Sequence, residues 1–251
     1  MKTVIISKDQ PEFIEELVSK LDTDYVIVLD RCTKAYPSGY NYIENKSGIG
    51  FLAGFCRDLG AKDVNDDILF LDGDKIPDVQ EKKVSSLSTM GYDCVLLGLG
   101  RKDLRLFMRS GEGLVPYSSQ SSIRSEIYSC GIYLSRNIIE KVRVLNDGRI
   151  FNSLFDGRWG EEDRYLGDEL TYLGAKIGYT SHIVLANNIT NLAISDDISK
   201  RKDYIKNHEI RLYLRSKLVK QENIKTEELK ENVRTKPAFS IDRNENPLFF
   251  V

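Results

Sequence analysis

Two carboxylates that flank a glycine follow one of the most apolar runs of the chain. Residues 68–71 predict a strand that is buried on both faces, and Asp72 and Asp74 come directly after it, on either side of Gly73. Side chains at i and i+2 of an extended backbone point the same way, and a glycine lets a ligand approach the main chain closely. Carboxylate oxygens in this arrangement suit Mg²⁺ or Mn²⁺, which often share them with the phosphates of a substrate. A plain Asp-Gly turn after a strand is the alternative explanation.

A second acidic segment comes later in the chain, where a helix is expected to begin. Trp159, the only tryptophan, and Gly160 precede Glu161, Glu162 and Asp163. Acids in a first helical turn have a structural explanation, because they complement the helix dipole and accept hydrogen bonds from free N–H groups. The segment also suits a sugar acceptor, since a tryptophan can stack on the apolar face of a sugar ring and a neighbouring carboxylate can deprotonate a hydroxyl. A buried Trp159 that wedges the loop is the alternative to a stacking platform.

Together the two segments resemble motifs of GT-A type glycosyltransferases, in particular the catalytic domains of family 2 and of the β4-galactosyltransferase branch, family 7. The triplet 72–74 matches the Asp-x-Asp motif, and its continuation to Pro77 resembles the Asp-x-Asp-x-x-Pro of that branch. Residues 159–163 resemble the Trp-Gly-Gly-Glu-Asp acceptor segment, with Glu161 where a second glycine is usual. Weaker similarities, in the order of the family, lie at residues 3–12, 49–60 and 129–136.

The resemblance implies a metal-dependent enzyme that moves a hexose from a nucleotide-diphosphate sugar, a UDP-sugar above all, to a hydroxyl of a saccharide or glycoconjugate. It implies that Asp74 binds Mn²⁺ or Mg²⁺ directly, and that Asp72 contacts the ribose of the donor or reaches the metal through water. Asp163 corresponds to the general base of inverting relatives, although retaining GT-A enzymes carry acids at similar positions for other purposes. Glu162 corresponds to the neighbour that binds acceptor hydroxyls. The expected acceptor-binding residues are Trp159, Glu161 and Glu162.

The expected donor site draws on residues at the ends of earlier elements. By resemblance, Asp30 hydrogen-bonds the nucleoside, Arg57 contacts the nucleoside or its phosphate, and Ser7 belongs to the opening strand beside them. An aspartate at the end of a strand is often only a turn former, which is the alternative for Asp30.

A third metal ligand is expected at His182, because relatives supply a histidine ligand after the acceptor segment. His182 follows that segment more closely in sequence than is usual for the family. The alternatives are Asn187, Asn188 or water as the ligand, and an ordinary surface position for His182.

Apolar runs alternate with amphipathic stretches, which predicts an α/β fold. We expect the GT-A (Rossmann-like) arrangement, a mostly parallel, doubly wound sheet with flanking helices, whose ligand crevice lies at the carboxyl ends of the strands. A helix is expected at 49–59 and a short one near 79–90. Residues 104–108 are expected as an edge strand, and the Gly- and Ser-rich residues 110–125 as a mobile loop or an ordinary surface connection.

The expected division of the chain is a catalytic domain and a helical extension. The catalytic domain covers residues 1–190, with a nucleotide-sugar-binding half at 1–100 and an acceptor-binding half at 101–190. The extension covers 191–251 and contains an amphipathic helix, because apolar residues recur there every seven positions. These residues are Ile198, Ile205, Leu212 and Val219.

The same helix is strongly basic, with eight lysines and arginines against two acids between residues 200 and 220. A solvated helix face explains this excess, and a patch for an anionic partner such as nucleic acid or a phospholipid surface is the alternative. The patch favours a second candidate function, a phage-type DNA glycosyltransferase that acts on hydroxymethylated or glycosylated bases. Arg211 and Arg215 are the candidate DNA contacts.

A third candidate function is a phosphohydrolase of the haloacid dehalogenase type, with Asp72 as the nucleophile. That family also places Asp-x-Asp after an apolar strand. Its motif normally lies nearer the N-terminus, however, and does not continue as Lys75-Ile76-Pro77.

Composition fits an ordinary globular enzyme, with 41% hydrophobic and 29% charged residues and a net charge of −2, which gives the whole molecule no bulk attraction for polyanions. Its cysteines are far apart and form no C-x-x-C pair, so we expect buried thiols in a reducing compartment and no disulfide framework or zinc site. No apolar stretch approaches the roughly 20 residues that span a bilayer. We therefore expect a cytoplasmic enzyme, bacterial or viral. The cysteines are Cys32, Cys56, Cys94 and Cys130.

Overall fold

The computed structural model describes residues 1–47, 53–79, 83–99, 112–114, 130–158, 160–187 and 198–232. The strands are β1 (Lys2–Ser7), β2 (Asp24–Asp30), β3 (Tyr42–Asn45), β4 (Ile68–Asp72), β5 (Lys75–Val79), β6 (Cys94–Leu99), β7 (Glu112–Leu114), β8 (Gly131–Leu134) and β9 (Ile177–Asn187). The helices are α1 (Ile14–Ser19), α2 (Ala53–Ala61), α3 (Arg136–Leu145), α4 (Glu162–Tyr172) and α5 (Ile198–Asn232). Short 3₁₀ segments lie at Pro11–Phe13, Val84–Thr89 and Ser153–Phe155.

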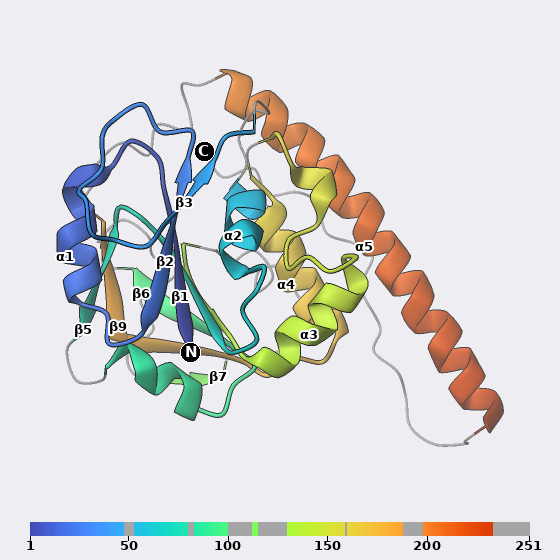
Figure 1. The fold of residues 1–251 in the computed structure, drawn as a ribbon. Helices are drawn as coiled ribbons and strands as arrows, with labels where there is room; N and C mark the ends of the chain where they lie inside the picture. Colours follow the sequence, from blue (N-terminus) through green and yellow to red (C-terminus); the bar gives the residue numbers. More distant parts are fainter. Residues whose placement is uncertain are drawn as a thin grey trace.

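The central sheet has a parallel half and a mixed half (Figure 1). Its strand order is β3-β2-β1-β4-β8-β6-β9-β5, with β7 paired to β9. The first four strands of this order run parallel, and β9 is parallel to β6. β8 is antiparallel to both of its neighbours, and β5 and β7 are antiparallel to β9. The predicted α/β fold, a central sheet with helices packed on both faces, is confirmed. The antiparallel strands were not foreseen, because an apolar run does not reveal the direction of its strand.

Alternate side chains of the strands pack into two apolar layers, one on each face of the sheet. Val4 and Phe70 belong to the layer that contains residues of α2, α3 and α4, whereas Ile5 and Leu71 belong to the layer that contains residues of α1. Figure 1 shows α1 on one side of the sheet and α2, α3 and α4 on the other. All four side chains are fully buried, and each such burial stabilises the fold by roughly 1.5–3 kcal/mol. The run 68–71 is therefore buried on both faces, as its sequence predicts.

The structure differs from several local expectations about secondary structure and the cysteines. The short helix expected near 79–90 is instead the end of β5 followed by a 3₁₀ segment. The edge strand expected at 104–108 lies outside the described residues, and within 110–125, expected to form a loop, the described part is the strand β7. All four cysteines are free thiols; Cys56 and Cys94 are buried, as predicted, whereas Cys32 and Cys130 are only partly buried.

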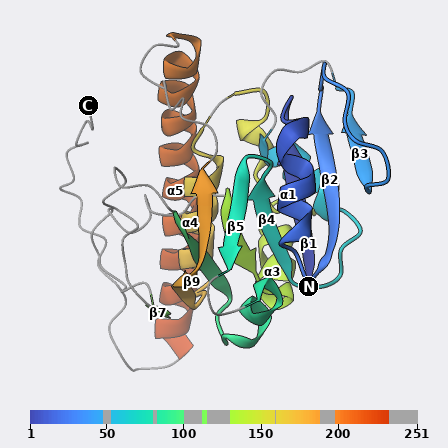
Figure 2. The same cartoon turned by 90° about the vertical axis from the view of Figure 1, so that its left-hand side faces the viewer.

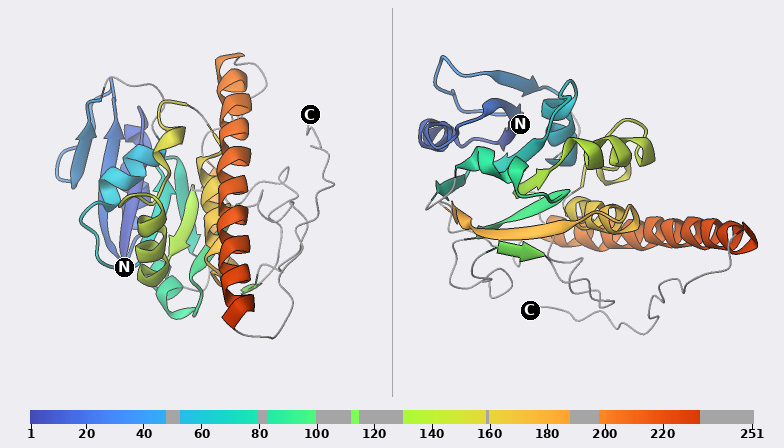
Figure 3. Two further views of the ribbon diagram at one scale, coloured as in Figure 1. Left: turned by 90° about the vertical axis from the view of Figure 1, so that its right-hand side faces the viewer. Right: turned by 90° about the horizontal axis from the view of Figure 1, so that it is seen from below.

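α5 forms the predicted helical extension, but a different face of it packs against the domain. It lies beside α4 (Figure 2), and its C-terminal end projects beyond the other helices and strands (Figures 1 and 3). Leu214 and Leu218 are its buried apolar residues, whereas Ile205 and Leu212 of the seven-residue repeat are 61% and 49% exposed. The repeat thus identified the helix and not its packed face, because polar side chains supply much of the contact. None of the described helices, α5 included, is both long and apolar enough to cross a membrane.

Substituting alanine for Gly60 in α2 is expected to destabilise the protein. Alanine normally favours a helix over glycine by up to about 1 kcal/mol. A Cβ at Gly60, however, would lie 2.5 Å from Cγ1 of Val4 and 2.9 Å from Cγ2 of Val28, and overpacking of this kind costs about 1–3 kcal/mol. Urea unfolding should show a lower free energy of unfolding for Gly60→Ala and little change for Lys62→Ala, an exposed neighbour. A more stable Gly60→Ala protein would contradict the tight packing of α2 on the sheet.

Candidate active site

The expected site residues of the first half lie where neighbouring parallel strands end. Ser7 is the last residue of β1, Asp30 the last of β2 and Asp72 the last of β4. In the ladder of β1 and β4, Ile6 lies opposite Asp72. The carboxyl ends of parallel strands are where α/β folds bind their ligands, so the topology brings these three residues to one edge.

Asp30 and Ser7 are both buried and already hydrogen-bonded. Arg31 donates to both carboxylate oxygens of Asp30, at 2.8 and 3.0 Å, and Nδ2 of Asn45 donates to Oδ1 at 3.0 Å. The hydroxyl of Ser7 lies 2.8 Å from the hydroxyl of Tyr36. Asn45 and Tyr36 were not foreseen from the sequence, because nothing in their own segments distinguishes them from surface residues.

The two carboxylates of the Asp-Gly-Asp turn each face a cation. Oδ1 of Asp72 accepts from Nη2 of Arg57 at 2.7 Å, and Oδ2 of Asp74 lies 2.6 Å from Nζ of Lys75. Gly73 passes directly over Ser7, since a Cβ at residue 73 would lie 2.8 Å from Oγ of Ser7. Only a glycine fits this approach without a shift of its neighbours.

Arg57 joins the two acidic segments. Its side chain is only 3% exposed, and it places Nη2 against Asp72 and Nη1 at 3.8 Å from Oε1 of Glu162. The guanidinium carbon lies 5.6 Å from the centre of the Phe151 ring. Among the described residues, Nε and Nη1 of Arg57 have no hydrogen-bond partner. Segments that are far apart in sequence therefore meet around one buried cation.

Glu162 and Asp163 form the first turn of α4, and both carry raised pKa values. Burial, assisted by the charge of Asp163, raises the pKa of Glu162 to about 7. Burial also raises the pKa of Asp163, although the positive charges of Arg57 and Arg164 oppose that shift. Oε2 of Glu162 is buried and has no hydrogen-bond partner among the described residues. Carboxyl groups of this kind are suited to exchange protons near neutral pH.

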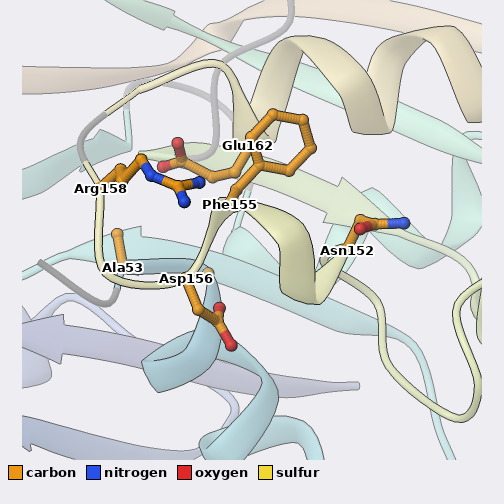
Figure 4. Close-up of a pocket in the computed structure, with 7 residues that line it drawn as sticks. Ala53, Asn152, Phe155, Asp156, Arg158 and Glu162 are labelled. Carbon is orange, nitrogen blue, oxygen red and sulfur yellow. The ribbon is translucent and has the colours of Figure 1, made fainter. Parts of the chain in front are cut away.

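A narrow crevice, too tight to hold a water molecule, lies beside Glu162. Figure 4 shows that the side chains of Glu162 and Arg158 lie on one side of it and that of Asp156 lies on another. Its lining residues come from the start of α2, from the segment 152–158 and from the start of α4. They are Ala53, Gly54, Asn152, Phe155, Asp156, Arg158 and Glu162.

Glu161 points away from this crevice and into the protein. Its side chain is fully buried between Nη1 of Arg164, at 2.7 Å, and Nη1 of Arg211, at 3.1 Å. Burial acts to raise its pKa, but Arg211 and Arg164 together lower the pKa below its ordinary value. The expected acceptor contact at Glu161 is therefore replaced by buried ion pairs, because the residue has a left-handed backbone (φ 72°) that turns its side chain toward α5.

His182 does not meet the acidic pair. In the antiparallel ladder of β5 and β9, Lys75 lies opposite Asn187 and Val79 lies opposite Ile183. His182, which precedes Ile183, therefore lies at the end of the ladder that is farther from Asp74. It is five residues from Asn187, or roughly 17 Å along the strand. Among the described residues no three His, Cys, Asp or Glu side chains come together to hold a metal ion.

Two further candidates have different outcomes. Trp159, the expected sugar platform, lies outside the described residues. Asn187, one of the alternative ligands, lies opposite Lys75 in the ladder and is therefore close to Asp74 in the strand pairing.

Asp58, which follows Arg57 in α2, was not expected in the site, yet it holds the segment that leads to the crevice. It accepts hydrogen bonds from Nε of Arg149 at 2.8 Å and from the backbone N–H of Ile150 at 2.7 Å.

Replacing Glu162 with glutamine is expected to change how stability depends on pH. The folded protein holds the Glu162 proton up to pH 7, whereas the unfolded chain releases it near pH 4.5, so wild-type stability falls as pH rises through this window, by about 3 kcal/mol. Glu162→Gln stays neutral, so its advantage in free energy of unfolding should grow from pH 4.5 to 7 and then level off. Urea unfolding at several pH values checks this, with Glu15→Gln on the exposed face of α1 as control. A difference that does not vary with pH would contradict the raised pKa.

No protein-family model and no curated protein matches the chain. Solved structures do match it. Residues 1–349 of S. aureus TarS in complex with UDP-GlcNAc are 18% identical, with a TM-score of 0.60; the match covers 84% of this chain and 65% of that one. The mannosyltransferase PcManGT from Pyrobaculum calidifontis, in complex with GDP-Man and Mn²⁺, is 14% identical over 76% of this chain and 58% of its own, with a TM-score of 0.52.

GalNAc-T7 with UDP, GalNAc and Mn²⁺ is 12% identical over 83% of this chain and 47% of its own, with a TM-score of 0.55. The chain thus spans less than two thirds of the length of each of these three. At such low identity the likeness concerns the fold. All three are GT-A type glycosyltransferases, and this chain has the GT-A fold.

Proposed function

We propose that this protein is a glycosyltransferase that moves a hexose from a nucleotide-diphosphate sugar, a UDP-sugar above all, to a hydroxyl of a saccharide or glycoconjugate. The observation that carries the proposal is the position of Arg57 between Asp72 and Glu162. The proposal is supported by the nearness of Arg57 to the Asp-Gly-Asp turn and to a pair of acids with raised pKa values, in a chain with the GT-A fold. The three similar structures, two with a nucleotide sugar and one with UDP and GalNAc, support a nucleotide-sugar donor.

The donor half of the site consists of residues from the first 100 positions, and the acceptor half of residues from 101–190. Ser7, Asp30 and Arg57 would bind the nucleoside and its phosphate, because they end or border the parallel strands. The acceptor would bind beside Glu162, with Trp159, three residues earlier in sequence, as the sugar platform.

A divalent metal ion, Mn²⁺ or Mg²⁺, fits the chemistry of Asp72 and Asp74. Such ions are commonly held by one or two carboxylates together with water and the phosphates of a substrate, so a third protein ligand is not required. Asn187 is the candidate for one, since it lies opposite Lys75. When bound, the ion would neutralise the negative charge on the departing diphosphate.

The transfer step uses the acids at the start of α4. Glu162 would bind the acceptor hydroxyl and Asp163 would take its proton, while the acceptor oxygen bonds to the anomeric carbon. The bond from that carbon to the diphosphate oxygen breaks, and its electron pair leaves with the diphosphate. The raised pKa of Asp163 makes it a stronger base than an ordinary aspartate. A base on the acceptor side implies inversion of the anomeric centre.

The two other candidate functions lose support. The DNA interpretation depended on exposed arginines of α5, but Arg211 is buried against Asp168 and Glu161. A phosphohydrolase would need Asp72 as a free nucleophile, whereas Oδ1 of Asp72 is bonded to Arg57. The three similar structures described above are glycosyltransferases.

Donor binding should depend on the metal and on Asp74. A ligand that binds only the folded protein raises its melting temperature by mass action, by RT ln(1 + [L]/Kd) in free energy. UDP-sugars with Mn²⁺ should therefore raise the melting temperature, and the same sugars with a chelator should not. Asp74→Asn should lose this shift, while Asp63→Asn, at an exposed position, should keep it. The absence of a shift with every UDP- and GDP-sugar in the presence of Mn²⁺ would contradict the proposal.

Asp163→Asn should lose sugar transfer and keep donor binding. General-base catalysis contributes about 10²- to 10⁴-fold to rate, so kcat should fall by that factor, while the Mn²⁺-dependent thermal shift with the donor stays. Release of UDP in the presence of a panel of saccharide acceptors measures the rate. A variant that retains the wild-type kcat would exclude Asp163 as the base.

A further inference from the structure

One turn of α5 contacts both residues that lead into the proposed catalytic pair. Asn207, which is fully buried, donates from Nδ2 to the carbonyl oxygen of Gly160 at 2.7 Å. Four residues later, Arg211 donates from Nη1 to Oε2 of Glu161 at 3.1 Å. The next residue of the chain is Glu162, so these contacts end where the proposed catalytic residues begin.

The turn that α5 holds has a demanding backbone. Gly160 and Glu161 both have left-handed conformations, with φ of 87° and 72°. Glycine adopts this conformation freely, whereas a glutamate rarely does. The motif that this segment resembles has glycine at both positions. A non-glycine residue keeps such a conformation only where its surroundings over-determine it, so something in this chain must constrain Glu161.

The buried carboxylate of Glu161 supplies that constraint. It lies 2.7 Å from Nη1 of Arg164, 3.1 Å from Nη1 of Arg211 and 3.4 Å from Nδ1 of His208. The ring of Tyr204 closes the turn from the same side, since a Cβ at Gly160 would lie 3.2 Å from it. Ion pairs to α5 thus take the place of the backbone freedom that a second glycine would give.

Arg211 fixes α4 at a second point. Its Nε donates to Oδ2 of Asp168 at 2.8 Å and its Nη2 to Oδ1 at 3.4 Å. Asp168 lies nearly two helical turns beyond Glu161. A planar guanidinium that bonds to both carboxylates defines the rotation of α4 about its axis as well as its position.

We propose that α5 is a positioning element for the catalytic helix, in which Asn207 and Arg211 lock the turn at Gly160 and Glu161 and so set the direction of Glu162 and Asp163 toward the acceptor. The inference rests on the proposed transferase function. In it, Arg211 acts through the acids of α4 and never touches a substrate.

The Asn207→Ala variant removes the hydrogen bond to Gly160 without a change in charge, and so tests whether this contact positions the start of α4. Small displacements of catalytic groups reduce rates strongly, so kcat for sugar transfer should fall roughly tenfold. The KM for the donor and the Mn²⁺-dependent thermal shift with the donor should stay within twofold of wild type, because donor residues lie on other elements. Lys206→Ala, the exposed neighbour on the same helix, should leave kcat unchanged. Arg211→Lys keeps the charge but loses the planar guanidinium that bonds to Asp168 and Glu161 together. It should also lower kcat, but by less than Arg211→Ala does.

Hydrogen exchange provides a readout that does not need activity. Amides of residues 160–164 should exchange at least tenfold faster in Asn207→Ala than in Lys206→Ala, while those of β1 and β4 stay the same. If the wild-type protein transfers no sugar, faster exchange still upholds the lock, and only the transferase function fails. An unchanged kcat in folded Asn207→Ala, or unchanged exchange at 160–164, would each overturn the proposal.

Discussion

The candidate site depends on one buried cation, Arg57. Three carboxylates lie near it, and the negative charge of each raises the pKa of Arg57. They belong to Asp72, Glu162 and Asp163. Without a cation among them, their mutual repulsion and desolvation would be costly, since buried charges persist only when paired. Arg57 of α2 donates a hydrogen bond to Asp72 at the end of β4. The adjacent Asp58 accepts hydrogen bonds from Arg149 and Ile150, so the same helix also contacts the segment that precedes the crevice. Neighbouring residues of one helix thus contact both the end of β4 and the segment 149–150.

Two adjacent acids at the start of α4 have different environments and therefore opposite pKa shifts. Glu161 is surrounded by arginines, which lower its pKa and keep it ionised. Glu162 is buried beside Asp163, which raises its pKa to about 7. Environments that push neighbouring pKa values apart are how proteins separate structural or ionised carboxylates from those that carry protons. Here the backbone makes the separation, because the left-handed conformation of Glu161 sends two consecutive side chains to different sides of the helix start.

The long C-terminal helix uses polar contacts where an amphipathic helix would use apolar ones. Leu214 and Leu218 pack against the domain, but nearer the site the contact consists of Asn207 and Arg211. Buried ion pairs add little net stability compared with apolar packing, because desolvation offsets the attraction. They do fix geometry, since a bidentate guanidinium tolerates few orientations. Such a contact suits a helix whose task is to hold another helix in register.

The sequence by itself determined the local features: the buried strand that ends in Asp72, the acids at the start of a helix, the alternation that gives an α/β fold, and the existence of a long final helix. These follow from periodicity and residue type over a few positions. Tertiary structure alone decided which side chains meet. The register of β5 and β9 separates His182 from Asp74, the backbone at Glu161 buries an expected acceptor contact, and the rotation of α5 turns Arg211 inward. Register and helix rotation depend on packing summed over the whole domain, and no short pattern of residues encodes them.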